Sequence, residues 1–318
     1  MKPFAISAAV VVAASVHLPA LAHGFVGQRF FPATIATDDP FVADELSLPT
    51  VSTQRVDSSA EPPTRQRSIE AEFSKRITSD FGISLGVAHQ RISAQGQPAV
   101  SGYENVDLGF KYQLHRSEAH ESLIAVGLGW EIGGTGSRAV REPVSTFTPT
   151  FFFGKGFGDL PNSWSSLKPL AVTGTVGVAF PSRSSTVTTS VDPDTGATAS
   201  DTERHPNVLQ LGLAAMYSLP YLQSAVRDVG LRAPLDRMIP IVEIALERPL
   251  NRVENRRVKG TVNPGLLWAG RHVQLGLEAI VPINRRSGHG VGAVVQLHFF
   301  LDDIFPRSIG RPLFGSAP

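Results

Sequence analysis

Charged and polar side chains recur at every second position of several apolar segments, and this spacing is the main chemical signal in the sequence. In a β-strand, successive side chains point to opposite faces, so a period of two gathers these groups on one face. The candidates on the polar face are Glu70, Glu72, Arg76, Asp107, Lys111, Glu131, Glu243, Glu247, Glu278, Gln296 and His298. Seven of them are acidic and two are basic. A pore lined in this way would attract cations and repel anions.

The same residues have a second interpretation as the filling of a narrow barrel. Their carboxylates could pair with Arg76, with Lys111 and with arginines that reach in from loops. A barrel of about twelve strands is narrow enough to be filled by its own side chains. Pore lining and internal filling are therefore both compatible with the pattern.

Patterns that would indicate catalysis or metal binding are weak. His298 has no serine at strand spacing in its own segment, and no His-x-x-x-His motif occurs. The chain has no cysteine, which excludes thiolate metal sites and cysteine nucleophiles. We expect no catalytic residue, no metal site and no cofactor, and we keep a hydrolase only as an alternative.

Strands separated by turns are the elements that would position the polar face. The clearest are 81–88, 106–114 and 124–132, where bulky apolar residues alternate with small or charged ones. Weaker segments with the same pattern are 68–77, 144–154, 169–180, 207–219, 239–247, 261–269, 273–281 and 290–300. The segment 290–300 ends in aromatic residues, and roughly 9 to 11 residues are what a tilted strand needs to cross a bilayer.

The lengths of the connections predict one further strand. If the short turns at 78–80, 116–120 and 270–271 lie on the periplasmic side, the longer polar connections lie outside. This alternation requires a first strand at 45–56, which closes against 290–300. The expected fold is therefore all-β, a transmembrane antiparallel up-and-down barrel of about twelve strands.

Two connections, 157–168 and 221–237, are long for periplasmic turns, and the second is the longer. The apolar residues Leu222, Ala225, Val226 and Val229 of the second connection are spaced for one face of a helix. The spacing predicts a short periplasmic helix that lies against the base of the barrel.

The two ends of the chain have compositions of their own. Residues 1–22 have a positive start, an apolar run and small residues before the expected cleavage after Ala22, as in a signal peptide. Residues 23–44 and 301–318 are rich in phenylalanine and proline. We expect a periplasmic or plug segment at 23–44, a barrel at 45–300 and a periplasmic tail at 301–318.

Composition narrows the class of partner. The formal net charge is +1, which argues against nucleic acid, whose binding needs a basic surface. Beyond the signal no stretch approaches about 18 apolar residues, which excludes a helical membrane protein. The expected partners are outer-membrane lipid and a small-molecule solute, and the expected state is a monomer in the outer membrane.

Two segments carry a resemblance to a known family. They are Arg-Phe-Phe-Pro-Ala-Thr at 29–34, continuing through Asp-Asp-Pro-Phe-Val-Ala-Asp-Glu-Leu at 38–46, and Phe-Gly-Lys-Gly-Phe-Gly-Asp-Leu-Pro at 153–161. With the His-Gly-Phe start at 23–25, they resemble proteobacterial outer-membrane β-barrel proteins similar to the transporter-like MetA-pathway of phenol degradation family. The resemblance implies a barrel of this size that passes small, aromatic or hydrophobic molecules. It implies no catalytic residues.

The expected function is an outer-membrane channel or facilitator for small molecules, either hydrophobic or cationic. The first alternative is a structural or adhesive barrel with a filled lumen, which would present the polar loop 182–203. The second is an outer-membrane hydrolase.

Overall fold

The computed structural model describes residues 24–58, 61–94, 96–191, 198–254 and 256–315. The expected signal peptide, its cleavage site after Ala22 and residue His23 lie outside the described residues. In the described part of the chain, none of the helices combines the length and apolar character required to cross a membrane.

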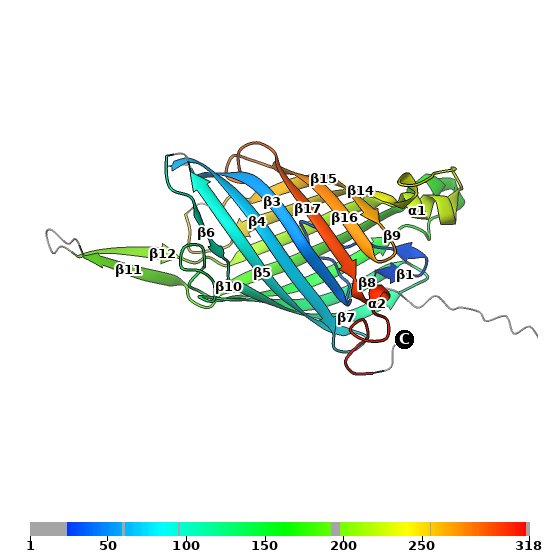
Figure 1. The fold of residues 1–318 in the computed structure, drawn as a ribbon, viewed down its shortest axis with the longest axis horizontal. Coiled ribbons are helices and arrows are strands. Elements are labelled where there is room, and N and C mark those ends of the chain that lie inside the picture. Colours follow the sequence, from blue (N-terminus) through cyan, green and yellow to red (C-terminus); the bar gives the residue numbers. More distant parts are fainter. Residues whose placement is uncertain (1–23, 59–60, 95, 192–197, 255, 316–318) are drawn as a thin grey trace, which may run out of the picture.

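Antiparallel strands form one closed barrel (Figure 1). Its sheet contains 13 strands. The short β6 (Val100–Tyr103) pairs with β5 beyond the point where β7 ends its own pairing with β5, so the two together occupy one position in the wall. Twelve strands therefore form the wall. They are β3 (Glu45–Ser58), β4 (Glu61–Arg76), β5 (Phe81–Ala94), β7 (Val106–Ser117), β8 (Ser122–Ile132), β9 (Thr146–Gly156), β10 (Leu170–Pro181), β13 (Val208–Tyr217), β14 (Met238–Pro249), β15 (Lys259–Ala269), β16 (Val273–Pro282) and β17 (Gly292–Phe300). The predicted up-and-down barrel of about twelve strands is confirmed.

The barrel closes between its last strand and its first, as the loop lengths predict. Val295 of β17 lies opposite Val51 of β3, and His298 lies opposite Ser47. A bulge in β3 shifts the register between Ser47 and Thr50. Such a bulge re-aims side chains locally, and both of these residues meet polar partners on β17.

The outer wall carries a belt of exposed apolar side chains. Ile69 is 53% exposed, Leu85 45%, Leu277 57% and Val295 49%. Residues of the opposite parity on the same strands, such as Glu278, face the interior. An apolar belt around a barrel with a polar interior is the arrangement that a lipid bilayer requires.

The two ends of the barrel differ, and we name them by what they carry (Figure 1). The hairpin end carries β11 (Ser185–Val191) and β12 (Thr198–Arg204), which pair as a projecting hairpin. The sequence predicts only a polar loop at 182–203, because these strands are mostly polar on both faces. The termini end carries the short hairpin of β1 (Phe25–Val26) and β2 (Arg29–Phe30), together with α2 (Leu301–Ile304).

The connection between β13 and β14 contains the predicted short helix, but as a few separate helical turns instead of one continuous helix. They are α1 (Leu219–Tyr221), a π-helical turn at Leu222–Val226 and a 3-10 turn at Leu235–Arg237. Val229, the last residue of the predicted apolar face, is outside these turns and 45% exposed. The buried residue of α1 is Tyr221, which the helical spacing does not single out.

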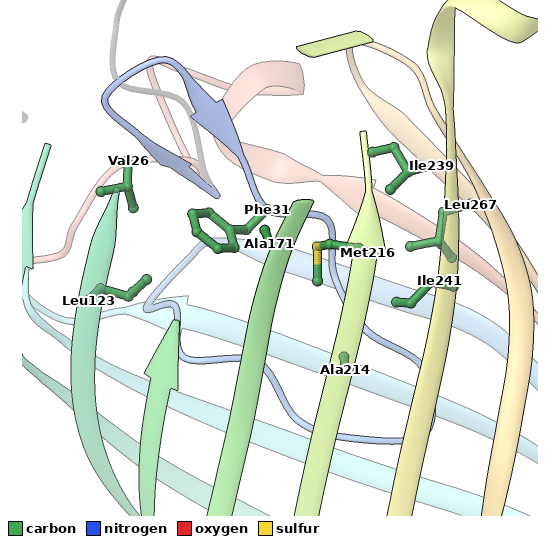
Figure 2. Close-up of a cluster of buried hydrophobic side chains, with 9 residues drawn as sticks. All are labelled: Val26, Phe31, Leu123, Ala171, Ala214, Met216, Ile239, Ile241 and Leu267. Carbon is green, nitrogen blue, oxygen red and sulfur yellow. The ribbon is translucent and has the colours of Figure 1, made fainter. Parts of the chain in front are cut away.

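The N-terminal segment turns into the barrel after β2. Figure 2 shows the chain passing Phe31 and looping through the interior before it returns to the start of β3. We call residues 31–44 the lumen segment. The C-terminal tail stays at the termini end, where Leu313 N donates to Arg76 O and Phe314 N donates to Ile77 O. Both terminal segments therefore pack on the barrel.

Candidate functional site

An apolar layer fills one side of the lumen near the termini end (Figure 2). Phe31 of the lumen segment is 1% exposed and belongs to this layer together with inward side chains of five wall strands. The buried layer consists of Val26, Phe31, Leu123, Ala171, Ala214, Met216, Ile239, Ile241 and Leu267. Burial of large apolar side chains stabilises by about 1.5–3 kcal/mol each, so this layer anchors the start of the lumen segment.

Glu243 on β14 binds the backbone of the lumen segment. Its side chain is fully buried and accepts hydrogen bonds from Ile35 N at 2.7 Å, Ala36 N at 3.1 Å and Thr37 N at 2.7 Å. The Thr37 hydroxyl donates a fourth bond, also at 2.7 Å. A carboxylate that accepts several N–H groups makes stronger bonds than a neutral acceptor would. Glu243 is thus a structural anchor inside the lumen.

Small residues on the wall make room for this contact. A Cβ added to Gly212 on β13 would lie 3.0 Å from Thr37 Cγ2, and one added to Gly276 on β16 would collide with Ile35 Cδ1. Gly265 on β15 gives similar space to Glu278, whose Cγ would lie 2.5 Å from an added Cβ. These glycines allow the segment and a second buried carboxyl group to lie close to the wall.

Lys111 on β7 binds Asp38 and Asp39 from the opposite wall. We call these two residues the tip of the lumen segment. The Nζ of Lys111 donates to Asp38 Oδ1 at 2.8 Å and to the carbonyl of Asp39 at 2.6 Å. It also lies 4.7 Å from the centre of the Phe152 ring, within the range of a cation–π contact. The lumen segment is therefore held by a carboxylate on one side and an ammonium group on the other.

Asp44 fixes the end of the segment to the base of β4. Its carboxylate is fully buried and accepts from Lys75 Nζ at 2.6 Å and from Arg76 Nε at 2.7 Å. Lys75 also donates to the carbonyls of Ile309 at 2.8 Å and Arg311 at 2.6 Å, so the C-terminal tail joins the same cluster. Arg76, a predicted pore residue, thus lies at the termini end among structural contacts.

A second buried ion pair, between Arg29 and Glu121, lies at the termini end beside the connection between β13 and β14. Arg29 Nε donates to Glu121 Oε2 at 3.0 Å, and the Tyr221 hydroxyl donates to Glu121 Oε1 at 2.7 Å. The Arg29 guanidinium stacks 3.7 Å from the centre of the Tyr221 ring and donates to the carbonyls of Pro169 and Lys168. Burial and the adjacent Glu121 carboxylate raise the pKa of Tyr221 to about 12. This pair ties the N-terminal hairpin to the turn before β8 and to α1.

Acidic residues gather beyond the tip of the lumen segment, towards the hairpin end. A cavity of about 440 Å³ is lined by Asp38, by Glu70 and Glu72 on β4, by Asp107 on β7 and by Glu131 on β8. We call this space the acidic cavity. In the described part of the chain, its lining includes these five carboxyl groups and no lysine or arginine. The acidic cavity is therefore a site that favours positive charge.

The acidic cavity shares lining residues with two further cavities around the lumen segment. A cavity of about 370 Å³ shares Asp38 and Glu72 with it and reaches Lys111 and Glu247. A third, of about 290 Å³, also contains Asp38 and Glu72, and reaches His298 and its neighbour Gln296 on β17. The three cavities therefore adjoin one another around the lumen segment, between the acidic cavity and the end of β17.

Polar side chains of β3 and β17 form a row across the closure of the barrel, beside the cavity that His298 lines. The Ser47 hydroxyl lies 2.9 Å from His298 Nδ1, and Glu45 Oε2 lies 3.2 Å from His298 Nε2. Gln296 Nε2 donates to Thr50 Oγ1 at 3.2 Å. Sequence reasoning missed Ser47 and Glu45, because the predicted closure gives the pairing of the two strands but not its register, which shifts at the irregularities beside Ser47 and His298.

One serine has the spacing of a known nucleophile motif. Gly-Ile-Ser-Leu-Gly at 82–86 matches Gly-x-Ser-x-Gly. That motif supports catalysis where the serine sits on a sharp turn between a strand and a helix. Ser84 lies instead within the extended β5, so the match does not form a nucleophile elbow.

The predicted residues thus fall into groups with different surroundings. Glu70, Glu72, Asp107 and Glu131 share the acidic cavity, whereas Glu243 and Glu278 are buried at the wall and Arg76 lies with Asp44. The role of these residues in lining a pore stays a prediction.

Sequence reasoning also missed the anchors Asp38 and Asp44, whose signal was charge inside an otherwise aromatic segment. Among the described residues, no group of His, Asp and Glu is placed to hold a metal ion.

The likeness to known proteins concerns the fold. No protein-family model matches the chain, and no curated protein matches it. Among solved structures, an outer-membrane channel from Pseudomonas putida F1 is similar, with 10% identity, a TM-score of 0.55, and coverage of 84% of this chain and 99% of that one.

Two other solved barrels are more distant. The NanC porin has 10% identity and a TM-score of 0.44, with coverage of 79% of this chain and 98% of that one. A mutant form of the TodX monoaromatic hydrocarbon channel has 8% identity and a TM-score of 0.44, with coverage of 83% of this chain and 89% of that one. The barrel fold is supported by the likeness to the Pseudomonas putida F1 channel, whose TM-score is 0.55.

Proposed function

We propose that this protein is an outer-membrane channel that passes small cationic molecules along the polar space beside its lumen segment. The observation that carries the proposal is that three cavities, which share Asp38 and Glu72 in their linings, lie around the lumen segment between the acidic cavity and His298. Carboxylates along such a path concentrate cations and lower the barrier to their passage. The protein would need no chemical step.

The same proposal includes the export of the chain, its oligomeric state and its orientation in the membrane. The chain would be exported by a signal peptide cleaved after Ala22 and would work as a monomer, with its hairpin end outside the cell. The apolar belt supports a place in a bilayer, and the similar barrel from Pseudomonas putida F1 is described as an outer-membrane channel.

Aromatic or hydrophobic solutes are the second substrate class. Phe41 and Phe152 line the cavity that contains Lys111, and this supports passage of a ring. The resemblance to the MetA-pathway of phenol degradation family points the same way. Acidic groups outnumber aromatic ones along the path, and we therefore place cations first.

Conductance in a planar bilayer tests the channel. Folded, purified protein should give single-channel currents, and a salt gradient should give a reversal potential of the sign expected for cation preference. A panel of small ammonium compounds and phenols would then separate the two substrate classes by current block. Absence of current from correctly folded protein would contradict the channel and favour a structural barrel with a filled lumen.

The row formed by Ser47, His298 and Glu45 favours the hydrolase as a second candidate. A hydroxyl, an imidazole and a carboxylate in series can pass a proton. The contacts, however, run in the reverse of the usual order, in which serine meets Nε2 and the carboxylate meets Nδ1. Ester hydrolysis by pure folded protein that disappears in Ser47→Ala would establish this activity, and its absence from the wild type would dismiss it.

A further inference from the structure

Four arginines lie together on the outer wall of the barrel at the hairpin end. All four are exposed, and they are Arg55 on β3, Arg65 and Arg67 on β4, and Arg91 on β5. Arg55 lies directly opposite Arg65, and Arg67 lies directly opposite Arg91. Like charges in directly opposed positions destabilise a sheet. We call these residues the arginine cluster.

The cluster lies at the edge of the apolar belt. Arg67 has the same parity as Ile69, which is 53% exposed, and Arg91 has the same parity as Val87, which is 43% exposed. Because a strand advances about 3.3 Å per residue, Arg67 lies roughly 7 Å beyond Ile69. Tyr103 is 63% exposed on the same wall, as an aromatic residue at a membrane interface would be.

The charges of the cluster are not neutralised by the part of the chain that the structure describes. Within those residues, none of the four guanidinium groups makes a hydrogen bond or an ion pair. The strand positions opposite or beside them include Thr53, Ser93 and Ser101, which carry no charge. Opposed cations in such surroundings are the arrangement that an external anion would stabilise.

We propose that the arginine cluster binds the phosphate groups of a phosphorylated glycolipid, the lipopolysaccharide of the outer leaflet. Guanidinium groups bind phosphate through paired N–H donors, and two opposed pairs match a headgroup with two phosphates. The acyl chains would then lie along Val51, Ile69 and Val87. The inference rests on the proposed place of the barrel in the outer membrane, and it does not depend on conduction.

Retention of lipid A tests the inference. Wild-type protein, folded in zwitterionic detergent, would be mixed with bisphosphorylated lipid A, and the bound lipid would be counted by native mass spectrometry. Replacing all four arginines of the cluster by Gln should weaken binding at least about tenfold, a change of about 1.4 kcal/mol.

A matched control removes the same charge at the termini end. It changes four exposed arginines of the connections and the tail to Gln, namely Arg227, Arg232, Arg271 and Arg307. Because these positions lie far from the cluster along the barrel, binding should stay within about twofold of wild type.

Two results of this experiment would overturn the inference. One is equal retention by the wild type and the cluster variant. The other is displacement of lipid A by inorganic phosphate at equal phosphate concentration, which would indicate a site for free anions. Neither result bears on conduction, so failure here is distinguishable from failure of the proposed channel.

A single charge reversal, Arg67→Glu, gives a second readout that does not need the quadruple variant to fold. In lipid-free detergent it should raise the melting temperature, because the new carboxylate would face Arg91. The same change should largely remove the stabilisation by lipid A. Unchanged stabilisation by lipid A in this variant would count against the cluster as the binding site.

Discussion

The carboxylate of Glu243 on β14 accepts a hydrogen bond of 2.7 Å from the backbone amide of Ile35, a residue 208 positions earlier in the chain. Three more donors, from Ala36 and Thr37, meet the same carboxylate. The wall of the barrel therefore holds the segment that occupies its lumen.

Glu243→Gln should loosen the lumen segment. The amide can accept fewer bonds than the carboxylate, and its own N–H groups would face backbone donors, at a cost of about 1–3 kcal/mol. Single-channel conductance should rise, and the free energy of unfolding in urea should fall. The control is Glu247→Gln, an exposed residue of the same strand, which should leave stability unchanged. If the two variants behave alike in both measurements, Glu243 is not the anchor.

Lys111 and Asp38 should be energetically coupled. Their side chains are 19% and 61% exposed, so a coupling of about 1 kcal/mol is expected. Lys111→Met, Asp38→Asn and the double variant form a cycle that urea unfolding can measure. Asp38→Asn should cost little stability when Lys111 is already Met. Additive effects of the two single changes would show that the contact does not hold the tip.

Asp107→Asn should reduce the preference of the channel for cations. Asp107 lies in the acidic cavity, directly opposite Glu131, and removing its charge makes the local potential less negative. Reversal potentials in a salt gradient should shift towards zero, with a fall of about twofold in the permeability ratio. Glu118→Gln, in the exposed turn at the termini end, removes the same charge away from the cavity and should change nothing. Equal selectivity in all three proteins would place the ion path elsewhere.

Tyr221→Phe should destabilise the barrel in a way that depends on pH. The hydroxyl of Tyr221 donates to Glu121, and loss of a bond to a charged group costs about 1.5–3 kcal/mol. The pKa of Tyr221 rises from 10.0 to about 12, so the folded protein holds this proton more tightly than the unfolded chain. The stabilisation is therefore complete below pH 10 and disappears as the pH rises towards 12.

Urea midpoints of wild type and Tyr221→Phe, measured between about pH 8 and pH 11.5, would follow this loss. Their difference should shrink at the upper end of the range. Tyr217→Phe removes an exposed hydroxyl bond of 3.2 Å to the carbonyl of Ser166 and serves as the control. A difference that stays constant with pH would contradict the assignment to Tyr221.

Local patterns were sufficient to predict the barrel wall. Strict alternation in 81–88, 106–114 and 124–132 predicts strands and faces, because the period of a strand is two whatever its partner. Loop lengths supply the first strand and its pairing with 290–300, which the opposition of Val51 and Val295 confirms. The hairpin of β11 and β12 was missed because its strands are mostly polar on both faces.

The strand count, the closure of the barrel and the inward faces follow from periodicity and loop length along the chain. The partners of the inward residues do not. Glu243 reaches the backbone of Ile35, Asp44 reaches Lys75, and Ser47 reaches His298, each across at least 31 positions of the chain. Such contacts depend on barrel closure and on the path of the lumen segment, and that path leaves no periodic signal in the sequence.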